Sequence, residues 1–451
     1  MRTPRSTALT VAVGAVTIAL ALTACSPSGG GGSGAKSSKP VTQAEIDKAM
    51  NTPTSLTFWS WVPDIQDEID LFEKKYPKIK VNLVNQGDAN AQYVKLRAAV
   101  KAGKGVPDVA QIGYDYLPSF TQTKSLLDLT PYGADKVASE FVPGVWSQVT
   151  QNGSIWAVPQ DSGPMGTLYR TDIFGKAGVS APTTWGEFAT AAQAVKKKTG
   201  AYITNIPGND MPQTLGFFSQ AGARPFGYDG KETVSIDVDN ATTQRVVGYW
   251  QDLIQKDLVA TDPDFTDAWY QGLSRGKYAT WLTAAWGPTF LAGSAKNTSG
   301  KWRAAVLPQW KAGENVAANW GGSSDAVMAA TSHPIQAYEL AKFINSDPSS
   351  TIKLANEQSL YPTTTATLSN PEFTDAKSDF YGGQQVNKFF AGVSKTVPQN
   401  QKYVPFQDYV NSSYNDTLGK AIAEHGDLKS ALSAWQKKLV SYAEQQGFSV
   451  K

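Results

Sequence analysis

The sequence predicts an α/β fold built from two lobes, and three observations carry this prediction. Between residues 55 and 112, short strand-like runs alternate with helical periodicity, which is typical of a mainly parallel sheet covered by helices. Residues 158–170 place two prolines and two glycines beside a short apolar run, as expected where a chain crosses between lobes. Finally, 451 residues are enough for two or three domains with substantial cores.

The first strand and helix follow from local patterning. Residues 55–61 alternate between apolar and polar side chains, as a strand does. Asp64 is expected to cap the next helix, because a side-chain oxygen at that position can accept a backbone N–H of the first turn. The apolar residues Ile65, Ile69 and Phe72 then recur with helical spacing.

Two more strands complete the first block. Residues 79–84 and 108–112 are predicted strands, and residues 93–100 resume helical spacing between them. In a parallel sheet, ligands bind beyond the carboxyl ends of the strands. The residues that this rule places along one rim are Trp59, Trp61, Gln86 and Asp115.

The second block also shows recognisable elements. Met165, Leu168 and Tyr169 predict a short buried strand after the crossing. Trp250 and its apolar neighbours predict a helix, and residues 421–445 predict another with a break at Gly426. Gln160 and Asp161 precede the buried strand, so the crossing is expected to contribute an amide and a carboxylate to a cleft.

The N-terminus predicts export and a lipid anchor. Arg2 and Arg5 precede an apolar run of signal-peptide length, and residues 22–25 (LTAC) look like the lipobox of bacterial lipoproteins. Residues 1–24 are therefore expected to be a lipoprotein signal peptide, with Cys25 as the lipidated (palmitate-bearing) first residue. Residues 25–52, Gly/Ser-rich at their start, are expected to form a flexible tether on the outer face of the cytoplasmic membrane.

Composition excludes several classes of function. The 41 basic and 39 acidic residues nearly cancel, so no nucleic-acid partner is expected. Two histidines and one cysteine leave almost no material for a zinc site or a Cys/His nucleophile, and neither a metal nor a cofactor is expected. Thirteen tryptophans are a high number, and large flat rings suit stacking on sugars as well as a core.

Several motifs in order resemble the extracellular solute-binding proteins of ABC importers, and within them the sugar-binding group that includes maltose-binding protein. The motifs are residues 58–61 (FWSW), 72–77 (FEKKYP), 107–109 (PDV), 158–170, 182–188 (PTTWGEF), 276–281 (GKYATW), 286–288 (WGP) and 319–327 (NWGGSSDAV). Each motif is weak alone, but their order and spacing cover nearly all of the mature chain.

This resemblance implies a periplasmic-binding-protein-like fold with three hinge crossings and a ligand cleft between the lobes. The first lobe is then residues 53–160 with 325–361, and the second is residues 161–324 with 362–451. The implied function is that of a receptor, not an enzyme, that binds an oligosaccharide and delivers it to ABC permease subunits. A monomer that touches the membrane only through its lipid anchor is expected.

The candidate binding residues are of two kinds, because sugars are recognised by aromatic rings on their C–H faces and by planar polar groups at their hydroxyls. The candidate aromatic platforms are Trp59, Trp61, Trp281, Trp286, Trp320 and Tyr361. The candidate hydrogen-bonding groups are Gln86, Asp115, Gln160 and Asp161.

Structural roles remain open for some of these residues. Trp281 lies in a strand-like run that suits a core position, and Asp161 could simply brace the crossing. Trp286 and Trp320 precede Gly-Pro and Gly-Gly, and these neighbours are expected to leave both rings uncovered.

Two other functions also remain open. A secreted glycoside hydrolase could use Asp115 and Asp161 as a carboxylate pair across the cleft. A receptor for a peptide, polyamine or osmolyte could use the same fold.

Overall fold

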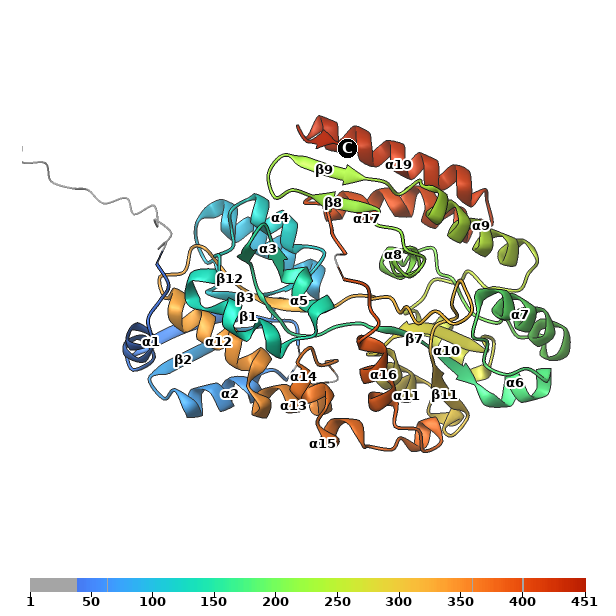
Figure 1. Cartoon of the computed structure of the whole chain (residues 1–451), viewed down its shortest axis with the longest axis horizontal. Helices are drawn as coiled ribbons and strands as arrows, with labels where there is room; N and C mark the ends of the chain where they lie inside the picture. The colour runs from blue at the N-terminus through green and yellow to red at the C-terminus, as the bar shows by residue number, and fades with distance from the viewer. Residues whose placement is uncertain (1–38, 63, 359, 400) are drawn as a thin grey trace, which may run out of the picture. The chain divides into compact units, whose positions relative to one another are not determined.

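The computed structural model describes residues 39–451 except residues 63, 359 and 400 (Figure 1). The expected signal peptide, Cys25 and residues 26–38 of the expected tether therefore lie outside the described residues. Within the described part, helix α1 (Gln43–Met50) begins at Thr42, whose side chain and that of Glu45 form a reciprocal capping box. Gln336 Nε2 also donates to the carbonyl of Ala49 at 3.3 Å.

Helix α1 corrects the expected tether, which was to reach residue 52 with folded structure starting at Pro53. Residues 41–50 contain no glycine, in contrast to the segment before them, and their capping box satisfies backbone donors at the helix start. Ordered structure therefore begins before Pro53.

The first block of the chain builds a five-stranded sheet. Its strands, in spatial order, are β2 (Ile79–Val84), β1 (Thr54–Trp59), β3 (Val109–Gly113), β12 (Ser323–Val327) and β6 (Val158–Pro159). Strand β1 is parallel to both β2 and β3, as the strand–helix alternation predicts. Strand β12 returns from far along the chain and is antiparallel to β3 and β6, which makes the sheet mixed.

Helices α2 (Gln66–Lys75) and α3 (Ala89–Ala102) connect the parallel strands. The periodicity predicted for α2 is confirmed, because Ile65, Ile69 and Phe72 are completely buried. The predicted cap is wrong: Ile65 occupies the capping position without a side-chain hydrogen bond. The reason is a turn before the helix, in which the Asp64 carbonyl accepts the backbone N–H of Asp67 at 3.2 Å.

The remaining elements around this sheet are α4 (Leu117–Gln122), α5 (Pro143–Val149), β4 (Thr150–Gln151), β5 (Ser154–Ile155), α12 (Pro334–Ser346), α13 (Pro348–Glu357), and the 3₁₀ turns Thr130–Tyr132 and Ala134–Glu140. Helix α12 packs against β12, α1 and α2. Figure 1 shows these elements together with the blue and cyan strands.

A second sheet contains β10 (Thr280–Ala284), β7 (Met165–Arg170) and β11 (Trp302–Ala305), with β7 in the centre and antiparallel to both neighbours. Strand β7 is the buried strand predicted from Met165 and Leu168. Since β6 belongs to the first sheet, residues 160–164 run from one sheet to the other. The predicted crossing in residues 158–170 therefore exists at this place.

A third sheet contains β13 (Ser449–Val450), β9 (Thr233–Ile236) and β8 (Phe226–Tyr228). Figure 1 shows β8 and β9 beside α9, α17 and α19, which brings the end of the chain against its middle. The other helices, including the short 3₁₀ and π segments, are α6 (Thr171–Ala177), α7 (Trp185–Thr199), α8 (Met211–Gln220), α9 (Ala241–Gln255), α10 (Asp267–Arg275), α11 (Gly287–Ser294), Lys296–Thr298, α14 (Thr365–Leu368), α15 (Pro371–Thr374), Asp379–Tyr381, α16 (Val386–Ser394), α17 (Gln407–Tyr414), Asn415–Gly419, α18 (Lys420–Ala423) and α19 (Leu428–Gln445).

Helix α2 also buries a carboxyl group whose titration affects stability. Glu68 is completely buried, and neither of its carboxylate oxygens accepts a hydrogen bond from the described residues. Burial raises the pKa of Glu68 to about 7. In the unfolded chain the pKa of Glu68 has its ordinary, lower value. At a pH between the two pKa values, the folded state therefore binds a proton that the unfolded state has released, and the free energy of unfolding falls as the pH rises toward 7.

Glu68→Gln is therefore expected to be more stable than the wild type at pH 7.5, by about 1–2 kcal/mol, and to lose this advantage at pH 5. Urea unfolding at both pH values measures the two free energies of unfolding. The exposed Glu372→Gln serves as the control for removal of a surface charge. An advantage of Glu68→Gln that is equal at both pH values would show that titration of Glu68 is not its cause.

Candidate functional site

An aromatic cluster forms where residues 306–322, which run from β11 in the second sheet back to β12 in the first, lie against β10 and the residues that follow it. The rings of Trp286 and Trp320 have centroids 4.8 Å apart and meet edge to face at 71°. Trp286 Nε1 donates to the backbone carbonyl of Trp320 at 3.2 Å, which fixes the indole in place. Trp281 on β10 extends the cluster, with its ring centroid 6.0 Å from that of Trp286.

Phe265 belongs to this cluster and was missed in the sequence. Its ring lies 6.1 Å from both Trp286 and Trp320, and 43 % of the residue is exposed. Its backbone φ angle is 56°, which is a left-handed conformation that is strained for a bulky residue. Such strain persists where the surrounding structure imposes it, and it concentrates at functional sites. No sequence pattern around Phe265 signals this conformation.

The predicted aromatic platforms in this cluster differ in how deeply they are buried. Trp281 and Trp320 are 3 % and 5 % exposed, whereas Trp286 is only half-buried. The prediction that neighbouring glycines leave the Trp320 ring uncovered is therefore wrong. The physical reason is tertiary, because Trp286 and Phe265 pack against that ring from distant parts of the chain. For Trp281 the structure favours the core role.

Asp115 lies in the loop after β3, where it lines a cavity of about 50 Å³. Burial raises the pKa of Asp115 to about 7, against the opposing effect of nearby backbone N–H groups. The cavity is completed from three distant segments by Met211 at the start of α8, Asn319 and Tyr403. Tyr403 and its neighbour Gln401 were missed, because their segment has neither a helical nor a strand pattern.

Gln160 and Asp161 tie the crossing to β12. Gln160 Nε2 donates to Asp325 Oδ2 at 3.0 Å, and the Gln160 side chain is buried. The carboxylate of Asp161 accepts bonds from both the backbone N–H of Ser323, at 2.8 Å, and the Ser323 hydroxyl. Burial raises the pKa of Asp161, while the bonds from Ser323 oppose that rise. These contacts favour a bracing role for both residues.

The other predicted residues have their contacts elsewhere. Trp59 is 8 % exposed in the core, and Tyr361 is buried with its hydroxyl donating to the Asn387 carbonyl at 3.3 Å. The half-buried ring of Trp61 packs edge to face on Tyr93. Gln86 is partly exposed after β2 and accepts a bond from Lys95 at its backbone carbonyl. The structure thus brings together Trp281, Trp286 and Trp320. The other four predicted residues described in this paragraph lie apart from that cluster.

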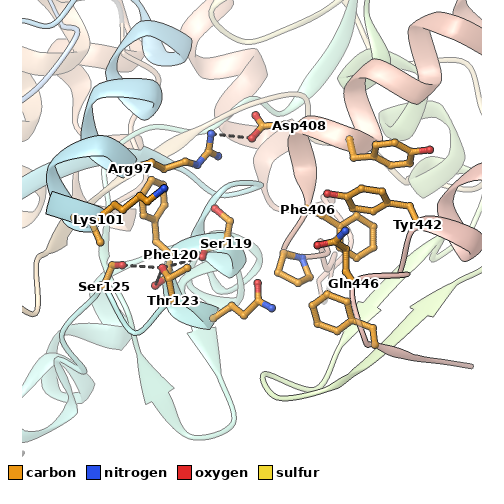
Figure 2. A pocket seen from close by; sticks show the side chains of 15 residues that line it. Arg97, Lys101, Ser119, Phe120, Thr123, Ser125, Phe406, Asp408, Tyr442 and Gln446 are labelled. Carbon is orange, nitrogen blue, oxygen red and sulfur yellow. Dashed lines mark hydrogen bonds and ion pairs between the residues drawn. The ribbon is translucent and has the colours of Figure 1, made fainter. Parts of the chain in front are cut away.

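A larger cavity, of about 570 Å³, lies between α3 and α4 on one side and residues 405–409 and α19 on the other (Figure 2). An ion pair links the two sides, with Arg97 Nη1 at 2.8 Å from Asp408 Oδ2. Among residues 39–451 apart from the three gaps, no group of three or more His, Cys, Asp or Glu side chains could hold a metal ion. Over the same residues, no helix is long and apolar enough to cross a membrane.

An α/β chain that crosses between two sheets and gathers aromatic rings beside the crossing has the architecture of a two-lobe binding protein. The chain belongs to the family described as bacterial extracellular solute-binding protein, which it matches over residues 59–350. Members of this family work outside the cytoplasm as binding components of ABC importers.

Individual relatives are more specific. The arabinooligosaccharide-binding protein of Bacillus subtilis (strain 168) is 27 % identical over 313 residues, covering 66 % of this chain and 71 % of the relative. The lactose-binding protein of Rhizobium radiobacter is 26 % identical over 361 residues, covering 76 % and 82 %.

Two solved structures are similar over almost their whole length. The ABC transporter associated binding protein from B. animalis subsp. lactis Bl-04, in complex with β-1,6-galactobiose, is 32 % identical with a TM-score of 0.75, covering 89 % of this chain and 100 % of that one. The galacto-N-biose/lacto-N-biose I-binding protein from Bifidobacterium longum, in complex with lacto-N-biose, is 25 % identical with a TM-score of 0.77, covering 88 % and 98 %. The predicted two-lobe α/β fold is thereby confirmed.

Proposed function

We propose that this protein is an extracellular receptor that binds an oligosaccharide and delivers it to the permease subunits of an ABC importer. The observation that carries the proposal is the aromatic cluster, in which the exposed ring of Phe265 and the half-buried ring of Trp286 lie side by side. Flat rings of this kind suit the C–H faces of sugar rings. The names of the relatives, which are oligosaccharide- and lactose-binding proteins, support the same class of ligand.

The site would combine these rings with the polar groups around Asp115. Asn319 lines the cavity of Asp115 and directly precedes Trp320, so the aromatic cluster and the cavity share one segment. Trp61 and Gln86 are proposed to face the sugar from the loops after β1 and β2. Lobe closure is proposed between residues 53–160 with 325–361 and residues 161–324 with 362–451, in a monomer. Closure of this kind would remove water from the sugar and strengthen its hydrogen bonds.

Attachment to the membrane is proposed to occur through a lipid on Cys25, after removal of a signal peptide at residues 1–24. The support is the LTAC motif at residues 22–25 and the single cysteine of the chain. Cys25→Ala is expected to move the protein from the membrane fraction into the medium or periplasm. Retention of this variant in the membrane fraction would contradict the anchor.

The direct test is a thermal-shift screen of residues 39–451 against mono- and oligosaccharides, amino acids, peptides and polyamines. A ligand at one hundred times its dissociation constant adds about 2.7 kcal/mol to the free energy of unfolding, which raises the melting temperature measurably. A shift with one class of oligosaccharide supports the proposal. A shift only with peptides or polyamines would keep the fold and replace the ligand.

A glycoside hydrolase is the second candidate, because Asp115 and Asp161 both have a raised pKa, as a general acid requires. Against it, the Asp161 carboxylate is held by two bonds from Ser323, and the family consists of binding proteins. Chromatography of oligosaccharides incubated with the protein separates the two functions, since only a hydrolase releases shorter sugars.

A further inference from the structure

The cavity of about 570 Å³ between α3, α4 and the C-terminal helices has the size of a small-molecule site but lies outside the aromatic cluster. We call it the tyrosine cavity. Its lining residues are Arg97, Val100, Lys101, Ser119, Phe120, Gln122, Thr123, Ser125, Pro405, Phe406, Asp408, Tyr409, Tyr442, Gln446 and Phe448. Figure 2 shows the polar side chains of α3 and α4 facing the aromatic side chains across it.

One wall of the tyrosine cavity is aromatic. Tyr409 and Tyr442 stack face to face, with centroids 3.8 Å apart and planes inclined by 9°. Phe406 packs on this pair, 5.4 Å from Tyr442. Both tyrosines are only partly buried, so the wall offers flat apolar surface to a ligand. Hydroxyl and amide side chains from α4 supply hydrogen-bonding groups opposite it, as a sugar requires.

The cavity also has one cation in excess. Arg97 and Lys101 are one helical turn apart on α3, and both line the cavity. Asp408 supplies a counterion for Arg97, but no hydrogen bond or ion pair joins Lys101 to another described residue. Two like charges at this spacing oppose each other. An anionic group bound in the cavity would provide the second counterion.

The tyrosine cavity and the cavity of Asp115 share no lining residue, but neighbouring segments of the chain line them. Tyr116, the residue after Asp115, accepts a bond at its hydroxyl from Asn411 Nδ2 at 3.3 Å, which joins the β3–α4 loop to α17. At the start of α17, Gln407 lines the small cavity and Asp408 lines the large one. A sugar chain that leaves the small cavity along α17 would therefore reach the tyrosine cavity next.

We propose that the tyrosine cavity binds a carboxylate-bearing sugar unit at the far end of the oligosaccharide, so that the preferred ligand is an acidic oligosaccharide. The unit would stack on the wall of Tyr409 and Tyr442, and its carboxylate would pair with Lys101. This inference rests on the proposed function and adds the charge of the ligand to it.

The test compares two trisaccharides by titration calorimetry: β-1,6-galactotriose, and the same sugar with a glucuronate in place of its non-reducing galactose. The wild type is expected to bind the acidic sugar more tightly. Lys101→Gln is expected to weaken binding of the acidic sugar about fivefold and to leave the neutral sugar unchanged. Lys104→Gln is the matched control, because Lys104 is exposed just beyond α3 and does not line the cavity. Raising the salt concentration should reduce the preference for the acidic sugar in the wild type only.

The outcomes separate this inference from the proposed function. If the neutral sugar binds and the acidic sugar has no advantage, or if Lys101→Gln affects both sugars equally, the tyrosine cavity is not a site for a carboxylate and the receptor function stands. If neither trisaccharide binds and no other oligosaccharide shifts the melting temperature, both proposals fail. Tyr442→Leu gives an independent check, since loss of the stacking ring should weaken binding of the acidic sugar while leucine retains apolar volume against Phe406.

Discussion

Trp286→Ala is expected to weaken oligosaccharide binding by about 30- to 100-fold while lowering the free energy of unfolding by only about 1–2 kcal/mol. The half-buried indole sits beside the exposed ring of Phe265, so it can contribute a large part of the stacking surface. Loss of a central aromatic contact typically costs 2 kcal/mol or more of binding, which corresponds to about this change in affinity. Calorimetric titration with the sugar found by thermal shift, together with urea unfolding, measures both quantities.

Trp320→Ala is the matched comparison, because it should lower the free energy of unfolding far more than Trp286→Ala does. Its ring is 5 % exposed and supports both Trp286 and Phe265, so its removal leaves a cavity and costs about 3–5 kcal/mol of stability. Phe290→Ala controls for exposure, because this ring is 51 % exposed and touches the cluster only through Trp286. If Trp286→Ala loses stability as Trp320→Ala does and binds sugar normally, Trp286 is a core residue and the site lies elsewhere.

Local sequence patterns were sufficient to predict the helices and strands discussed below. The buried positions of α2 repeat with helical spacing, and the strand at residues 79–84 matches β2 at both ends. Thr184 and Glu187 are three residues apart, the spacing of a capping box, and the structure has this capping box at the start of α7. These features depend on side chains within one or two turns of each other, which is the range over which periodicity and capping carry information.

Tertiary features escaped this reasoning. Strand β12 lies antiparallel in a sheet that the strand–helix alternation predicts to be mainly parallel, because it enters the sheet from more than two hundred residues downstream of β3. The ring of Phe265, whose backbone is left-handed, packs among four tryptophans, and only Trp269 is near it in sequence. The spacing of residues along the chain contains no signal for either feature.

In the candidate site, too, some features could be predicted from residue type, whereas others depend on tertiary packing. Three of the predicted aromatic residues, Trp281, Trp286 and Trp320, lie together, but exposure of Trp320 could not be read from its glycine neighbours. Gly163 packs closely on the Trp320 carbonyl, so this glycine brings two segments of the chain together instead of opening space. Gln160 and Asp161 are polar as a ligand site requires, yet their partners Asp325 and Ser323 arrive from β12. Ligand contact by the ten predicted residues stays a prediction.

Gly163→Ala is expected to destabilise the protein by about 3 kcal/mol or more, because the two crossing segments have no room for a methyl group. A Cβ at this position would lie 1.9 Å from the Trp320 carbonyl oxygen and 2.7 Å from its carbonyl carbon, and both are backbone atoms. Two hydrogen bonds hold the segments at this separation: Gly163 N–H to Asn319 Oδ1 at 3.0 Å, and Trp320 N–H to the Gly163 carbonyl at 2.8 Å. Relief of the clash must break these bonds or move the crossing, and overpacking of this kind is costly.

The matched control is Gly175→Ala on α6, where a Cβ meets no atom within 4 Å. That substitution is expected to stabilise the protein by about 0.5–1 kcal/mol, because alanine loses less backbone entropy than glycine in a helix. Urea unfolding of both variants measures the difference, and sugar titration of Gly163→Ala shows whether a displaced crossing also disturbs Trp320 and its neighbours. A Gly163→Ala variant as stable as the wild type would mean that the crossing segments separate easily, in which case the contact at Gly163 is a movable part of the hinge and not a fixed brace.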